Sequence, residues 1–123
     1  MTYDKKNVFA KIIRKELPAQ IIYEDEHILS FADISKAAPV HILVIPKGRY
    51  VNLVDFTNNA NINEIAHFFK KVSEIAKKYG DNGFRIISNT GHDAEQTVEH
   101  FHVHILAGKK LGPLLDKTSM QMV

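Results

Sequence analysis

His100-Phe101-His102-Val103-His104-Ile105-Leu106 is the most informative stretch of this chain, because its three histidines alternate with large apolar residues. In an extended strand, successive side chains point to opposite faces of the sheet. The alternation therefore predicts a strand with three imidazoles on one face and Phe101, Val103 and Ile105 on the other. Histidine has the side-chain pKa closest to neutrality, so this face is expected to be reactive or metal-binding.

The length and composition of the chain are those of one globular domain. It has 123 residues, of which 45% are hydrophobic and 24% charged, so it can bury a core unaided. It contains no Cys, which excludes disulfides and thiolate metal sites. The net charge is only +2 and the basic residues are scattered, which argues against nucleic-acid binding. No signal segment or membrane-spanning run is visible, so we expect a cytoplasmic protein without membrane contact.

Hydrophobic periodicity predicts two helices and five strands. The helices are expected at residues 7–15 and 62–79, where Asn61 caps the longer helix and Gly80 ends it in a left-handed conformation. The strands are expected at residues 21–24, 28–32, 40–45, 84–88 and 100–106. This order predicts an α+β fold in which helices pack against a largely antiparallel sheet.

Adjacent imidazoles permit two kinds of chemistry. Two histidines spaced i and i+2 can bind a metal ion if a third ligand comes from elsewhere, and His41 and His92 are candidates. A neutral imidazole can instead attack phosphorus, provided that its tautomer is fixed and donors stabilise the phosphoryl oxygens. A polar loop leading directly into a histidine strand fits anion binding better than a closed metal cage. Candidate donors are Asn89, Gln96, Thr97, His104 and the backbone N–H groups near Gly91.

The histidine motif and several further segments resemble the histidine triad (HIT) family. Residues 100–106 match the pattern His-φ-His-φ-His-φ-φ, in which φ is apolar, and segments 9–13, 31–35, 38–47 and 89–91 resemble its nucleotide-binding (Hint) branch. The resemblance implies one HIT domain over residues 1–123, with a core of about 7–108 and a tail at 109–123. It also implies a five-stranded, mainly antiparallel sheet with two helices, and a homodimer whose two sheets join.

The same resemblance implies a purine nucleoside phosphoramidate hydrolase that needs no metal or cofactor. By the family pattern, His102 attacks the α-phosphorus, releases an amine and forms a nucleotidyl-histidine, which water cleaves to a monophosphate such as AMP or GMP. His100 and His41 match supporting positions. The positions that match the nucleotide site are His104, Thr97, Gln96 and Asn89 for the phosphate, Asp33 for the ribose, and Val8, Phe9, Ile12, Phe31 and Ile34 for the base.

Two departures from the family pattern are visible. Glu95 stands where many relatives have Gly, and a carboxylate beside the phosphate loop would repel the substrate unless it points to solvent. The zinc-binding positions of some relatives correspond here to Asn7, Ala10 and Arg49, so no such site is expected. Two alternatives remain: a non-catalytic purine-nucleotide-binding or partner-interaction protein, and a metal-dependent hydrolase using two triad histidines.

Overall fold

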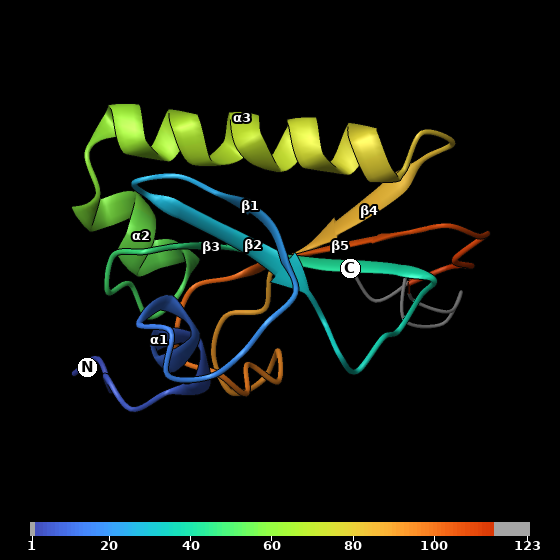
Figure 1. Ribbon diagram of the computed structural model, residues 1–123. Helices are drawn as coiled ribbons and strands as arrows, with labels where there is room; N and C mark the ends of the chain where they lie inside the picture. The colour runs from blue at the N-terminus through green and yellow to red at the C-terminus, as the bar shows by residue number, and fades with distance from the viewer. Residues whose placement is uncertain (1, 115–123) are drawn as a thin grey trace.

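The computed structural model describes residues 2–114 and shows one sheet with helices on both faces (Figure 1). The sheet has the strand order β1-β2-β3-β5-β4, and all neighbouring strands are antiparallel. This confirms the predicted α+β fold with its five-stranded sheet. Of the predicted tail, residues 115–123 lie outside the described part. In chain order the elements are α1 (Val8–Ile13), β1 (Ile21–Glu24), β2 (Ile28–Ala32), β3 (Val40–Pro46), α2 (Leu53–Asn59), α3 (Ile62–Tyr79), β4 (Phe84–Ile87) and β5 (Val103–Ala107).

The larger core lies between α3 and one face of the sheet. The Asn61 side chain caps α3 as predicted, because its Oδ1 accepts the Glu64 N–H at 2.8 Å. Phe101, Val103 and Ile105 point into this core, so the apolar half of the predicted alternation is confirmed. From the helices, the buried partners are Phe56, Phe68, Val72, Ile75 and Ala76. Within residues 2–114, no helix combines the length and the apolar character needed to cross a membrane.

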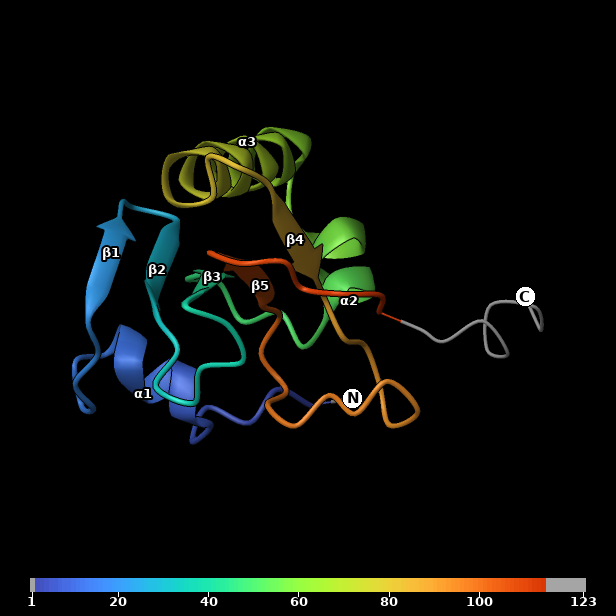
Figure 2. The same cartoon turned by 90° about the vertical axis from the view of Figure 1, so that its right-hand side faces the viewer.

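A smaller core lies between the sheet and α1. This helix lies on the opposite side of the sheet from α3 (Figure 2). The helix begins at the cap Asn7, whose side chain accepts the Ala10 N–H at 2.9 Å. Phe9 and Ile12 project from α1 towards the sheet. There they pack against Leu29, Phe31, Leu43 and Ile45. Because α1 is only 6 residues long, it covers part of this face and leaves room for a cavity beside it.

The histidine stretch enters the sheet later than predicted. β5 begins at Val103, which pairs with Val44, so a continued ladder would place Phe101 opposite Pro46. Proline has no N–H to donate, and the ladder stops before it. The Phe101 N–H instead donates to the Tyr50 carbonyl at 2.7 Å. His100 and His102 therefore precede the strand and are held by other contacts.

Two further features differ from the sequence expectation. The structure adds a third helix, α2, whose 7 residues bury only Phe56 and are too few to show periodicity. Gly80 ends α3 with a φ of −124°, so the expected left-handed conformation is wrong. Glycine is needed there for space, since a Cβ would lie 2.9 Å from the Ala107 Cβ and 3.0 Å from the Phe84 Cβ. The end of α3 thus packs tightly on β4 and β5.

Candidate active site

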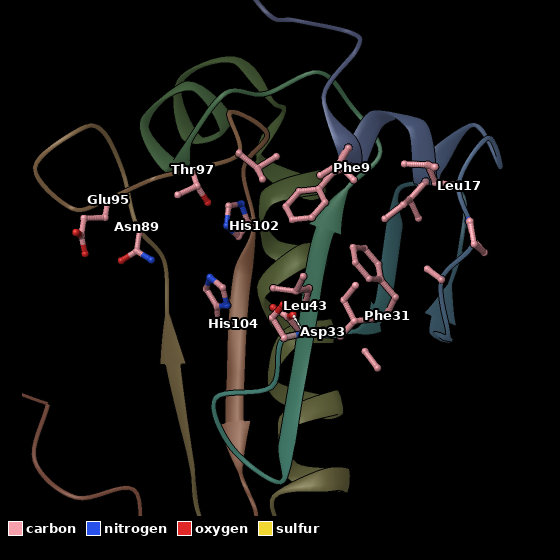
Figure 3. A pocket seen from close by; sticks show the side chains of 18 residues that line it. Phe9, Leu17, Phe31, Asp33, Leu43, Asn89, Glu95, Thr97, His102 and His104 are labelled. Carbon is pink, nitrogen blue, oxygen red and sulfur yellow. Dashed lines mark hydrogen bonds between the residues drawn. The ribbon is translucent and has the colours of Figure 1, made fainter.

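A cavity of about 660 Å³ opens beside α1, a volume typical of small-molecule sites (Figure 3). One end is apolar and the other is polar. The apolar end is formed mainly by Val8, Phe9, Ile12, Leu17, Phe31 and Leu43. The polar end is formed by Asn89, Glu95, Thr97, His102 and His104, and Asp33 lies between the two ends. The cavity can therefore hold a ligand with an apolar part and an anionic part.

The structure brings most of the residues singled out from the sequence to this cavity. Ile34 lies at its rim, with 97% of its surface exposed. His41 and His100 do not line the cavity but contact residues that do. Gln96 is the only predicted nucleotide-binding residue absent from the lining of the described cavity. Those that line it are Val8, Phe9, Ile12, Phe31, Asp33, Ile34, Asn89, Thr97, His102 and His104.

The tautomer of His102 is set by the backbone. Its Nδ1 lies 2.7 Å from the His100 carbonyl oxygen, which can only accept, so Nδ1 carries the proton. A neutral His102 therefore keeps the lone pair on Nε2. Burial lowers the pKa of His102 below its ordinary value, and only 6% of the residue is exposed. The ring of Phe9 packs edge-on against it, with centroids 4.9 Å apart. His102 thus presents a neutral, oriented imidazole to the cavity.

A second chain of hydrogen bonds orients His104. The Ala37 N–H donates to His41 Nδ1 at 3.0 Å, so a neutral His41 carries its proton on Nε2. That Nε2–H lies 2.9 Å from His104 Nδ1 and 3.3 Å from Asp33 Oδ2. A neutral His104 consequently carries its proton on Nε2. Burial lowers the pKa of His104 to about 4, which keeps the ring neutral near pH 7. His104 can therefore donate a hydrogen bond within the cavity.

The same three side chains are the natural candidates for a metal centre. In the described residues, Asp33, His41 and His104 form the one group of three or more His, Asp or Glu side chains whose ligand atoms all lie within 4.8 Å of one another. A metal ion beside His104 would need the lone pair of His41 Nε2. The Ala37 N–H, however, occupies the lone pair of His41 Nδ1 and places the proton on Nε2. The contacts therefore fit a hydrogen-bonded chain better than a metal site, and His92 is fully exposed elsewhere.

His100 is completely buried and fixes the start of the triad. Its Nε2–H donates to the Pro46 carbonyl at 2.8 Å, and its Nδ1 accepts the Tyr3 hydroxyl at 2.6 Å. Burial lowers the pKa of His100 to about 4, so this ring is also neutral. Since the His100 carbonyl holds His102, anchoring the first histidine positions the second.

Gln96 braces the loop before the triad instead of reaching the cavity. Its Nε2 donates to the carbonyls of Val51 and Val98 at 2.7 and 3.0 Å, so both amide protons are used. Its Oε1 accepts the Gly91 N–H at 3.0 Å. These contacts leave the side-chain amide of Gln96 no free donor for an anion, and the assignment of Gln96 to the phosphate stays a prediction. Gln96 positions the loop that carries Thr97.

Several residues of the site were not singled out as site residues from the sequence. Leu17, Leu43 and Val98 line the cavity, but in sequence they resemble ordinary core positions. Tyr3 lies in the N-terminal segment, far from the triad in sequence. The Ala37 N–H is a backbone donor, which no residue pattern reveals. Pro18, which follows α1 and lines the cavity, was the one sequence signal for this part of the wall, because a proline marks the end of a helix.

Comparisons with known proteins agree with this fold and identify the family. The HIT domain family matches residues 14–111. An uncharacterized HIT-like protein of Rickettsia prowazekii is 54% identical over 116 residues, which cover 93% of this chain and 97% of that protein. A protein of Escherichia coli K12 named purine nucleoside phosphoramidase is 36% identical over 113 residues, which cover 90% and 94% of the two chains. A solved HIT family hydrolase from Clostridium thermocellum has a TM-score of 0.81 at 41% identity, covering 91% of this chain and 99% of its own. The chain belongs to the HIT domain family.

Proposed function

We propose that this protein hydrolyses purine nucleoside phosphoramidates to a nucleoside monophosphate and an amine, as a Hint-type enzyme. The observation that carries this proposal is the His102 imidazole, neutral and with its Nε2 lone pair at the cavity. A neutral imidazole in a fixed tautomer is a nucleophile for phosphorus. The name of the Escherichia coli relative, purine nucleoside phosphoramidase, supports the same reaction class.

The cavity has one region for each part of a nucleotide. The base lies at the apolar end, against the side chains of Phe9, Phe31 and Ile12, where the two phenyl rings pack edge to face with centroids 5.7 Å apart. Asp33 accepts hydrogen bonds from the ribose hydroxyls through its carboxylate. The α-phosphate lies at the polar end, where donors stabilise its charge. In this arrangement the phosphate donors are Asn89, Thr97 and the Nε2–H of His104.

The reaction proceeds in two displacements at phosphorus. His102 Nε2 attacks and forms an N–P bond while the P–N bond to the leaving amine breaks, and the amine takes a proton from solvent. The resulting nucleotidyl-histidine is cationic on its ring, and the Nδ1–H to the His100 carbonyl stabilises that charge. Water then attacks phosphorus, the Nε2–P bond breaks, and one proton returns to solvent. His102 is recovered neutral, so atoms and protons balance.

The test compares His102→Ala with wild type on adenosine 5′-phosphoramidate. Removing a covalent nucleophile lowers kcat/KM by several orders of magnitude, about 10³-fold or more. His92→Ala is the matched control, since this fully exposed histidine lies outside the cavity and its loss leaves the rate unchanged. When turnover is quenched in alkaline denaturant, in which a histidine N–P bond survives, mass spectrometry finds one nucleotidyl group on the peptide that contains His102.

Equal rates for His102→Ala and wild type would refute the catalytic role. Binding of AMP in a calorimeter without turnover of any phosphoramidate would assign the chain to non-catalytic nucleotide binding instead. Activity is expected to persist in EDTA, because no step uses a metal ion. Its loss in EDTA, with recovery on adding back zinc, would favour the metal-dependent alternative.

A further inference from the structure

Glu95 adopts a backbone conformation that is unfavourable for its side chain. Its φ is 60°, and in the described residues Lys15 is the only other non-glycine with a positive φ. An L-residue is disfavoured there, because its Cβ comes too close to the following carbonyl oxygen. The conformation is imposed by a tight turn, in which the Glu95 N–H donates to the His92 carbonyl and the Gln96 N–H to the Gly91 carbonyl. A glycine at position 95 would satisfy the same turn without this strain.

The charge of Glu95 is unfavourable for an anionic ligand as well. Glu95 lines the polar end of the cavity beside Asn89, on the side away from Phe9 and Phe31 (Figure 3). Together with Asp33 it gives the cavity two carboxylates, and no lysine or arginine of the described residues lines it. A phosphate group adds a further negative charge. The site as a whole therefore favours a ligand that also brings positive charge.

The position of Glu95 indicates which part of the ligand carries that charge. With the base at the apolar end and phosphorus at His102, the nucleoside occupies the side of the cavity near Phe31. A group displaced from phosphorus leaves opposite the attacking Nε2 of His102, away from the nucleoside. The remaining polar wall, which includes Glu95, is the part of the cavity available to it.

We propose that Glu95 selects phosphoramidates whose leaving amine carries, apart from the scissile nitrogen, a group that is positively charged at neutral pH, such as a terminal ammonium or guanidinium. This inference rests on the proposed function and names its substrate class. The chemistry is unchanged: the P–N bond breaks, the scissile nitrogen takes a proton from solvent, and the distant cation leaves with its charge intact. The carboxylate of Glu95 offsets the repulsion it exerts on the phosphate by attracting that cation.

The test uses three adenosine 5′-phosphoramidates whose leaving groups have equal chain length and end in an ammonium, a hydroxyl or a carboxylate. For wild type, kcat/KM follows the order ammonium, hydroxyl, carboxylate. Glu95→Gln keeps the length and the backbone strain of Glu95 but removes its charge. The variant lowers the ammonium-to-hydroxyl ratio of kcat/KM by roughly three- to tenfold, as expected for one partly solvated charge pair.

Asp93→Asn is the matched control, because Asp93 is fully exposed in the same loop and does not line the cavity. It removes the same charge and leaves the ammonium-to-hydroxyl ratio unchanged.

The inference is overturned if Glu95→Gln leaves this ratio unchanged while all three compounds are hydrolysed, or if Asp93→Asn lowers the ratio equally. If wild type hydrolyses none of the three, the proposed function fails and this inference fails with it. Equal thermal midpoints for both variants show that the ratio reports charge and not unfolding.

Discussion

Backbone atoms assign the protons on the histidines around the cavity. The carbonyl of His100 places the proton of His102 on Nδ1, and the N–H of Ala37 places the proton of His41 on Nε2. Burial keeps the rings of His102 and His104 neutral, so each tautomer persists at neutral pH. In the proposed reaction, His102 is thereby set as the nucleophile and His104 beside it as a hydrogen-bond donor.

The protonation of these rings predicts an unusual pH profile. Protonation of His102 Nε2 removes the lone pair, so activity falls as the pH drops through the pKa of the folded enzyme. Because burial lowers the pKa of His102, and that of His104 to about 4, we expect the acidic limb of kcat/KM to lie below pH 6.5. Initial rates across a buffer series at constant ionic strength measure the profile. An acidic limb centred at pH 6.5 or above would contradict the neutral triad.

The free energy of unfolding also depends on pH, because His100 titrates differently in the folded and unfolded chains. It therefore needs to be measured over the same pH range as the activity. The pKa of His100 is about 4 in the folded protein and returns to the ordinary histidine value of 6.5 on unfolding, so the unfolded chain binds more protons between these values. The contribution of the neutral, buried ring is complete above pH 6.5 and is lost as the pH falls towards 4. Urea titrations at each pH separate this loss of folded protein from the loss of activity.

The sequence was enough to single out the three histidines and the apolar residues of the cavity. It did not reveal the hydrogen bonds that orient the histidines. The alternation of histidine with apolar residues from His100 onward is visible directly in the sequence. The tautomers depend on Ala37 and on the carbonyl of Pro46, backbone groups far along the chain. The contacts of the Gln96 side chain were hidden for the same reason, because its partners at Val51 and Gly91 come together only in the folded loop.

The strands and the long helix α3 were predictable because periodic patterns of sufficient length define them. Residues 62–79 show that period over five turns, and the structure has the helix with the same bounds. α2 has only 7 residues and one buried side chain, so no period can develop. The late start of β5 follows from Pro46 on the neighbouring strand, a pairing that the sequence of β5 alone does not contain.

The contact at the end of α3 gives a test of packing between elements. In Gly80→Ala the new Cβ would lie 2.9 Å from the Ala107 Cβ, closer than real Cβ contacts allow. We expect a loss of roughly 1–3 kcal/mol in the free energy of unfolding, typical of overpacking. The double variant Gly80→Ala/Ala107→Gly removes the nearest clashing atom and should recover part of that loss. Chemical denaturation measures both, and a neutral Gly80→Ala would show that the packing is loose.

The sheet has two open edges, which bear on the predicted homodimer. β1 carries an irregular register between Ile21 and Tyr23, and such bulges hinder pairing with another strand. β4 is regular, and its exposed side chains include Phe84 and Ile86, at 44% and 41%. Exposed apolar side chains on a regular edge favour association. We therefore predict that the homodimer forms through the β4 edge.

Light scattering tests this prediction at micromolar concentration. The wild type is expected at twice the chain mass of 14.0 kDa. Ile86→Lys should shift it to the mass of one chain, because a charge would be buried in the joint. Ile62→Lys is the control, since Ile62 is 76% exposed and belongs to α3, not to an edge strand. A monomeric wild type would refute the homodimer, and a dimeric Ile86→Lys would refute the β4 edge.

One face of the strand β5 packs in the main core, and the other faces the cavity. Val103 and Ile105 belong to the main core beneath α3, while His104 faces the cavity on the other side. The cavity walls come mostly from α1 and from loops, whose side chains contribute little to that core. Substitutions in the loops can therefore change which compounds enter without loosening the scaffold. Related chains with diverged specificities are expected to differ at such rim positions and to agree at the residues beneath α3.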